Sequence, residues 1–172
     1  MAVLDKKTFL ILYKSLIRPK LEYNNTVWWP GSKLDVSKLE GVQRRATKLV
    51  PELKHLSNTE KLKILNLPTL NYRRIRGDCI QVYKYLNDYY DVNWSALFIL
   101  NESNYNTRGH SYKLAKVTHN STTRSKFFTV RVVNYWNALP EEIVYATSLN
   151  AFKNAFDEHW KNNPMKFDPD CI

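Results

Sequence analysis

The sequence has few of the residues that usually carry special chemistry or special backbone geometry. Only two cysteines, Cys79 and Cys171, and four glycines occur among its 172 residues. Two cysteines form at most one bridge, so disulfides do not supply the framework of the fold, and we expect free thiols in a reducing compartment. So few glycines, with seven prolines, exclude collagen-like and low-complexity chains.

Long apolar runs are also absent. No stretch approaches the roughly 18 apolar residues of a membrane-spanning helix, and residues 9–13 are too short for the core of a secretory signal. An apolar content of 44%, with 13% aromatic residues, nevertheless excludes a disordered chain. We therefore expect a globular protein inside the cell, in the nucleus or cytoplasm, that is neither secreted nor bound to a membrane.

Motifs of common catalytic sites are missing as well. The sequence contains no glycine-rich phosphate loop, no Cys-x-x-Cys pair and no His-Glu-x-x-His. Its four histidines are scattered, so their spacing with the two cysteines leaves a zinc site open but does not indicate one. The acidic pairs at 141–142, 157–158 and 168/170 fall in an acidic tail, where helix capping and solubility explain them. We predict no catalytic residue, no metal site and no cofactor in this chain alone.

Positive charge is what the sequence has in excess. It carries 26 Lys and Arg against 16 Asp and Glu, a net charge of +10. The excess lies in two blocks, +6 in residues 1–50 and +5 in residues 101–136, whereas residues 137–172 carry −3. A field of this sign attracts polyanions, of which nucleic acid is the commonest. A basic surface that serves only solubility explains the charge equally well, so charge alone leaves both interpretations open.

Apolar residues recur at steps of three and four along most of the chain, which predicts helices. The expected helices cover residues 5–18, 35–50, 57–65, 69–87, 128–139 and 148–161. Between residues 101 and 125 the pattern fails, although Tyr112, Leu114 and Val117 alternate as in a short strand. We therefore predict a mainly α fold, with a bundle-like helical domain over residues 1–100. Residues 101–172 would form a C-terminal extension, with a loop-rich basic segment that has room for a short β-hairpin and then two helices.

Several positions refine this prediction. Asp5 is placed to cap the first helix, which Pro19 should kink or end near residue 17 or 18. Ser57 and Glu60 form a capping box. Gly77 weakens the helix over residues 69–87 and would permit another helix to approach closely there. In the helix over residues 35–50, the stripe expected to face the core is Val36, Leu39, Val42, Ala46 and Leu49.

Clusters of basic residues remain as candidates for binding. Arg44, Arg45 and Lys48 lie mostly off the apolar stripe of their helix, and Arg73, Arg74 and Arg76 cluster near the start of the next long helix. The residues around the loop-rich segment are Arg108, Lys113, Lys116, Arg124, Lys126 and Arg131.

Aromatic residues stand beside these cations, as Tyr72, Tyr112 and Phe127 do. A basic groove with stacking faces holds single strands and hybrids without reading their sequence. The alternative is that the aromatics belong to the core and the arginines pair with acids, as Arg74 and Asp78 could at a spacing of four. We interpret the aromatics as core residues and the arginines as candidate phosphate contacts.

Seven blocks, in order, resemble one known family. They are LYKSLIRPKLEY at 12–23, LEGVQRRATK at 39–48, LPTLNYRRIRGD at 67–78, YKYLN at 83–87, TRGH at 107–110, FFTVRVVNYWNALP at 127–140 and FKNAFDEHW at 152–160. Together they are similar to the reverse transcriptases of non-LTR retrotransposons (LINE elements) of the jockey type. The likeness covers about residues 10 to 160, and it matches the part of the polymerase that follows the palm, which is the helical thumb and the C-terminal extension.

The resemblance implies a role for the basic residues. A thumb packs against the template–primer duplex and contacts its phosphates, so RNA, DNA or an RNA–DNA hybrid would be the partner. The resemblance also adds His110, next to Arg108 in the TRGH block, as a contact to RNA, and it makes Trp136 and Asn137 structural. The missing palm of the polymerase would be a protein partner.

The same resemblance argues against activity of this chain alone. In the family, the palm carries an adjacent Asp-Asp pair that binds Mg²⁺, and no such pair occurs in this sequence. We therefore expect a non-catalytic fragment or relic of an RNA-directed DNA polymerase. The pair Asn24-Asn25 departs from the small or apolar residues expected there. Two alternatives stay open: a captured remnant that binds another protein through its helical faces, and a pseudogene product that folds poorly without its palm.

Overall fold

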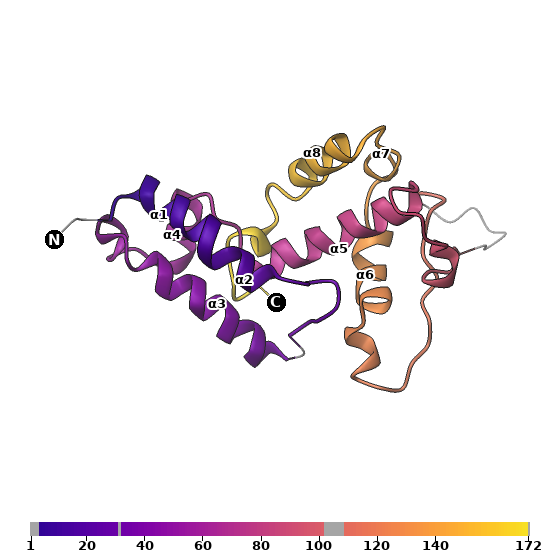
Figure 1. Ribbon diagram of the computed structural model, residues 1–172, viewed down its shortest axis with the longest axis horizontal. Helices are drawn as coiled ribbons and strands as arrows, with labels where there is room; N and C mark the ends of the chain where they lie inside the picture. Colours follow the sequence, from indigo (N-terminus) through magenta and orange to yellow (C-terminus); the bar gives the residue numbers. More distant parts are fainter. Residues whose placement is uncertain (1–3, 31, 102–108, 172) are drawn as a thin grey trace. The chain divides into compact units, whose positions relative to one another are not determined.

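The computed structural model describes residues 4–30, 32–101 and 109–171, and the described chain is mainly helical, as predicted (Figure 1). Its α-helices are α1 (Lys6–Leu12), α2 (Arg18–Glu22), α3 (Lys33–Thr47), α4 (Asn58–Ile64), α5 (Leu70–Leu86), α6 (Phe128–Asn137), α7 (Glu141–Val144) and α8 (Leu149–His159). A π-helical turn (Tyr13–Ile17) joins α1 to α2, and 3₁₀ turns cover Pro51–Leu53, Trp94–Ala96, Arg124–Lys126 and Pro164–Lys166.

Polar side chains at the helix starts explain where several helices begin. The side chains of Asp5, Ser32 and Ser148 each accept a hydrogen bond from the backbone N–H three residues later. Ser57 and Glu60 form the complete capping box that the sequence predicts. Because each cap satisfies an N–H group that would otherwise lack a partner, the start of the helix is fixed locally by sequence.

The chain folds as two compact units, each built from segments distant in sequence. Unit 1 comprises residues 1–24, 30–74 and 162–172, and unit 2 comprises residues 25–29 and 75–161. The predicted boundary after residue 100 therefore falls inside unit 2, and the observed division lies within α5. The C-terminal segment belongs to unit 1 because Thr69 donates its hydroxyl to the carbonyl of Met165 (2.8 Å) and its N–H to that of Lys166 (2.9 Å).

Pro19 perturbs its helix without ending it. A proline inside an α-helix removes one hydrogen bond and clashes with the preceding turn. Here the turn before it widens, so that the N–H of Arg18 reaches back to the carbonyl of Tyr13. Pro19 then lies in the first turn of α2, where a missing N–H costs nothing. The helical path therefore runs on to Glu22, four residues beyond the predicted end at residue 18.

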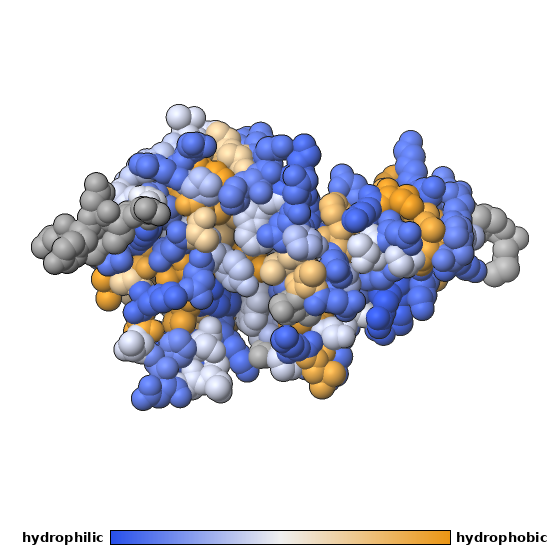
Figure 2. Space-filling view, turned by 180° about the vertical axis from the view of Figure 1, so that it is seen from behind, coloured by the Kyte–Doolittle hydropathy of each residue, from blue (hydrophilic) through white to orange (hydrophobic). Residues whose placement is uncertain are grey.

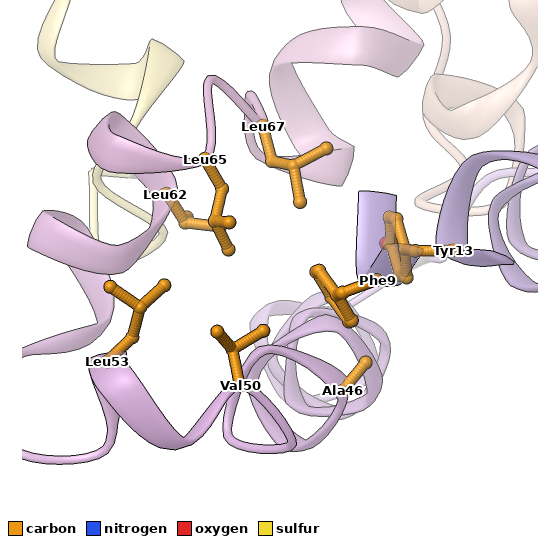
Figure 3. Close-up of a cluster of buried hydrophobic side chains, with 8 residues drawn as sticks. All are labelled: Phe9, Tyr13, Ala46, Val50, Leu53, Leu62, Leu65 and Leu67. Atoms are coloured by element: carbon orange, nitrogen blue, oxygen red, sulfur yellow. The ribbon is translucent and has the colours of Figure 1, made fainter. Parts of the chain in front are cut away.

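The core of unit 1 is an aliphatic cluster with two aromatic rings. Figure 3 shows its buried side chains converging from α1, α3, α4 and the connections around them, namely Phe9, Tyr13, Ala46, Val50, Leu53, Leu62, Leu65 and Leu67. The rings of Phe9 and Tyr13 stack with their centroids 5.7 Å apart. Burial of so many apolar side chains supplies the main stabilisation of this unit.

The buried side of α3 is more polar than its apolar stripe predicts. Val36 and Ala46 are buried as expected, but Leu49 is 59% exposed, whereas Gln43 is buried. Tyr13 donates its hydroxyl to Oε1 of Gln43 (2.6 Å), and Nε2 of Gln43 donates to the carbonyl of Pro68 (3.2 Å). The hydrogen bonds satisfy these buried polar groups, and so Gln43, which lies outside the expected stripe, is accommodated in the core.

Aromatic rings fill the core of unit 2. Phe152 is fully buried, with its ring centroid 4.5 Å from that of Tyr83 and 6.1 Å from that of Trp136. Further along α8, Phe156 stacks on Trp160 at 5.4 Å. These contacts hold α8 against α5 and α6, because large rings bury more apolar area than aliphatic side chains do.

The loop-rich segment is held by backbone and side-chain hydrogen bonds. The described residues contain no strand, and the expected hairpin is reduced to one antiparallel bridge between Leu100 and Leu114. Trp136 donates its Nε1–H to the carbonyl of Tyr112 (2.8 Å), and the amide of Asn137 bonds to both the N–H and the carbonyl of Leu114. Both side chains are structural, as predicted.

On the face drawn in Figure 2, hydrophilic residues predominate and apolar residues form separate patches. Among the described residues of unit 1, the largest exposures of aliphatic side chains include 60% for Ile11 and for Leu16. Within the described ranges, no helix has the length and apolar character needed to cross a membrane.

Gly77 does not mark a close approach, contrary to expectation. In the described part of the chain, and apart from the adjacent residues and the backbone of the same helix, no atom lies within 4 Å of the position that a methyl group would occupy there. We expect Gly77→Ala to raise the free energy of unfolding by about 0.5–1 kcal/mol, because alanine restricts the unfolded chain and favours the helix. Denaturant unfolding followed by circular dichroism measures the change. A loss of stability would show that space is restricted at this position.

Candidate nucleic-acid interface

Three predicted cations form an exposed group at the C-terminal end of α3. Arg44 and Arg45 lie in the last turn of this helix and Lys48 directly follows it. All three are exposed, and no carboxylate of the described chain forms an ion pair with them. We call these three residues the α3 patch.

The helix itself orients the α3 patch. Ala46 and Thr47 are buried on the opposite side, so the helical period directs the three cations outward. A methyl group at Gly41 would lie 3.6 Å from an Nη atom of Arg45 and 3.9 Å from one of Arg44. Both guanidinium groups therefore extend back along α3 over the same glycine, as side chains on a helix tend to do.

One structural role of the α3 patch is its interaction with the dipole of α3. Cations in the last turn of a helix stabilise it by roughly 0.3–1 kcal/mol each at low salt. That interaction leaves the guanidinium and ammonium groups accessible. The α3 patch can therefore also meet an anion from solution.

The predicted cations at the start of α5 are engaged inside unit 1. Arg73 forms a bidentate ion pair with Glu22, in which Nη2 lies 2.8 Å from Oε2 and Nε contacts Oε1. Arg74 is buried and donates to the carbonyl of Leu21 at 2.8 Å. These two residues act in the packing of α2 against α5, and we withdraw them as phosphate contacts.

Two further predicted cations are engaged inside unit 2. Arg76 pairs with Asp157 of α8 through two hydrogen bonds of 2.6 and 2.7 Å. Arg131 pairs with Asp78 through bonds of 2.8 and 3.0 Å, with only 7% and 3% of the two side chains exposed. Its remaining N–H groups donate to the carbonyls of Lys126 and Asn25, both at 2.8 Å. Arg76 and Arg131 are likewise withdrawn.

His110 is also buried, with only 2% of its surface exposed. Its Nε2 lies 3.2 Å from the carbonyl of Trp136, and burial lowers the pKa of its imidazole. A buried imidazole is not accessible to phosphate in this structure, which argues against the expected contact of His110 to RNA. Its neighbour in the TRGH block, Arg108, lies outside the described residues.

The other predicted cations of unit 2 differ in exposure. Lys113 is half-buried, and its side chain passes close to Gly109, whose φ of 112° favours glycine. Lys126 is half-buried as well. Arg124 is exposed, and its guanidinium carbon lies 5.0 Å from the ring centroid of Phe127. Of these three residues, Arg124 is the most accessible to an anion.

The carboxylate of Glu40, which sequence analysis did not single out, lies next to the α3 patch. It accepts a hydrogen bond from the N–H of Asn71 at 2.9 Å, so this buried anion faces the first turn of α5. Burial outweighs this contact and the charge of Arg74, and it raises the pKa of Glu40 to about 7. Glu40 and Arg44 both line a hollow of about 40 Å³. The signal in the sequence that could have indicated the burial of Glu40 is its spacing of four residues from Val36, which places both on the same side of the helix.

The structure therefore sorts the predicted cations into two kinds. The α3 patch is assembled and open, whereas the carboxylates of unit 1 and unit 2 bind Arg73, Arg76 and Arg131. The described residues also bring together no group of three or more His, Cys, Asp or Glu side chains that could hold a metal ion.

Comparison with known proteins adds no relative. No family model, curated protein or solved structure matches this chain.

Arg131 is expected to be essential for stability. Arg131→Ala would leave the Asp78 carboxylate buried without its bidentate partner, which costs about 3–5 kcal/mol in comparable pairs. The control is Arg124→Ala, which removes an exposed cation near the start of the same helix and should change the free energy of unfolding by no more than about 0.5 kcal/mol. Denaturant unfolding compares the two. Equal stability of both variants would contradict the structural role.

Glu40 is expected to make stability depend on pH. Because its pKa is raised in the folded chain, its contribution is fully present below about pH 4.5 and is lost as the pH rises through about 7. A shift of this size corresponds to roughly 3 kcal/mol. Glu40→Gln retains an acceptor for the N–H of Asn71 and removes the charge, so it should be more stable than the native chain at pH 8 and similar at pH 5.

Urea unfolding at both pH values measures this effect. The matched control is Glu142→Gln, an exposed glutamate of α7 that should behave like the native chain at either pH. A loss of stability of Glu40→Gln that is equal at pH 5 and pH 8 would show that the carboxylate is ionised throughout.

Proposed function

We propose that this chain binds nucleic acid through the phosphate backbone, with the α3 patch as the contact. The observation that carries the proposal is the exposure of Arg44, Arg45 and Lys48 without an ion-pair partner in the described chain, whereas Arg73, Arg76 and Arg131 are each paired with a carboxylate. Charges already paired with carboxylates add little to the outward field. The α3 patch therefore supplies a concentrated part of the accessible positive charge.

The chemistry of the α3 patch suits phosphates. Guanidinium groups present several N–H donors in a planar fork that matches phosphate oxygens, and a lysine adds a mobile point charge. Contacts of this kind release counterions and hold a duplex in place without reading bases. RNA, DNA and RNA–DNA hybrids would all be accepted, with affinity set mainly by salt.

The resemblance to non-LTR reverse transcriptases gives this binding a specific context. On that basis we propose that the chain is the thumb and C-terminal region of an RNA-directed DNA polymerase, acting inside the cell on a template–primer duplex. Among the described residues, no three His, Cys, Asp or Glu side chains converge where a metal ion could bind. The role that we propose is binding, and no catalytic step is assigned to this chain.

One observation favours a second candidate, a protein-interaction module. Ile11, Leu12 and Leu16 lie in α1 and the following π-helical turn and are 60%, 43% and 60% exposed. Neighbouring exposed apolar side chains are typical of surfaces that another protein covers. If the resemblance holds, the palm of the polymerase would be such a partner.

The triple variant Arg44→Ala, Arg45→Ala, Lys48→Ala tests the main proposal. We expect it to bind an RNA–DNA hybrid more weakly for every sequence, and to lower the slope of log affinity against log salt by about 2–3, roughly one per lost contact. Fluorescence anisotropy of a labelled hybrid at several salt concentrations measures both quantities.

A second triple variant controls for net charge. The variant Lys14→Ala, Lys33→Ala, Lys63→Ala removes the same charge from three exposed positions outside the α3 patch. They lie in the π-helical turn, at the start of α3 and in α4, respectively. It should retain more affinity and a steeper slope than the first variant. Identical losses in the two variants would mean that only total charge matters, and no binding of the native chain at low salt would remove the proposal.

A further inference from the structure

Unit 2 contains a groove, and none of the residues that line it belongs to the α3 patch. The groove has a volume of about 190 Å³ and is lined by Lys116, Val117 and His119 on one side and by Val130, Val133 and Asn134 of α6 on the other. Its lining combines apolar side chains with a cation, an imidazole and an amide. An apolar surface with few polar groups is typical of a binding site for a small or planar group.

An exposed aromatic ring lies at the start of α6, one turn before the groove. Phe127 caps this helix with an extended backbone, and its carbonyl accepts hydrogen bonds from the N–H groups of Val130 (3.0 Å), which lines the groove, and of Arg131 (2.9 Å). The ring of Phe127 is 51% exposed, and the guanidinium of Arg124 lies against it. A stacking face and a cation are therefore found together at the start of the helix whose next turn lines the groove.

The residues that line the groove include a lysine and no carboxylate. The sequence contains no Asp or Glu between residues 103 and 140. In the described structure, Lys116 and Arg124 form no ion pair with a carboxylate. The groove therefore favours an anionic occupant.

We propose that this groove binds single-stranded nucleic acid, with an unpaired base at Phe127 and the valines and with phosphates at Lys116 and Arg124. Only an anion that also offers a flat apolar face satisfies both features, and a strand with unstacked bases does so. A duplex keeps its bases stacked and paired, so it cannot place a base here. The volume is below the range of about 300–1,000 Å³ for drug-sized ligands, which fits one base better than a large cofactor.

The proposal is independent of the α3 patch, because the two sets of residues belong to different units. The α3 patch would hold any phosphate backbone, whereas the groove would distinguish a single strand from a duplex. Each can therefore fail without the other.

The test uses the full chain and a labelled oligothymidine, alone or paired with oligoadenosine, followed by fluorescence anisotropy. Phe127→Ala should weaken binding of the single strand by about 5- to 150-fold, the range for loss of one base–aromatic stack. It should change binding of the duplex less than about twofold. Phe127→Trp keeps a stacking face and should bind the single strand at least as tightly as the native chain.

Two controls come from the same unit. Tyr145→Ala removes an aromatic side chain of similar exposure, 46%, that does not line the groove, and it should leave single-strand binding unchanged. Lys116→Ala should lower the salt slope for the single strand by about 0.7, the contribution of one phosphate contact, whereas Lys153→Ala on α8 should not.

Two results would overturn the proposal: native affinity of Phe127→Ala for the single strand, or equal losses of single-strand binding in Phe127→Ala and Tyr145→Ala. Failure of the α3 patch has a different signature. In that case the Arg44, Arg45 and Lys48 triple variant would bind the duplex with the same affinity as its charge-matched control. Phe127→Ala would still bind the single strand more weakly than the native chain.

Discussion

The buried ion pair between Arg131 and Asp78 is the interaction on which unit 2 depends most. A charge removed from water must be paired and hydrogen-bonded, or its burial costs several kcal/mol. Arg131 meets this requirement with the carboxylate of Asp78 on α5 and with the carbonyls of Lys126 and Asn25. Its guanidinium also lies 4.9 Å from the ring of Trp29. One side chain on α6 therefore fixes α5 and brings residues 25–29 into unit 2.

The same requirement decides which part of the positive charge is available for function. Every carboxylate that binds an arginine removes that arginine from the outward field, so a net charge of +10 does not locate a binding surface. In unit 1, Glu22 engages Arg73 and leaves the α3 patch open. In unit 2, Asp78 and Asp157 each bind an arginine, and cations such as Lys116 stay unpaired beside the groove. The cations of the two proposed contacts with nucleic acid form no ion pair with a carboxylate of the described residues.

Local features made most of the helices predictable. A capping side chain and an apolar period act within one or two turns, so Ser57 with Glu60 and the pattern before Pro140 were sufficient to place helices. The effect of Pro19 was harder to predict, because the π-helical turn before it lets the helical path continue, and the sequence pattern does not indicate that turn. The polar core positions of α3 were also hidden. Gln43 is acceptable in the core only because Tyr13 and the carbonyl of Pro68 lie within hydrogen-bonding distance.

The sequence by itself determined the helical class, most helix starts and the excess of positive charge, since each depends on neighbouring residues or on composition. Only the tertiary structure decided which cations are accessible. The partners that bind Arg73, Arg76 and Arg131 are 51, 81 and 53 residues away in sequence, so no local sequence pattern predicts these ion pairs. Burial of His110 likewise requires the packing of Trp136. Long-range pairing, set by how the helices pack, therefore separates structural charges from those that can bind a ligand.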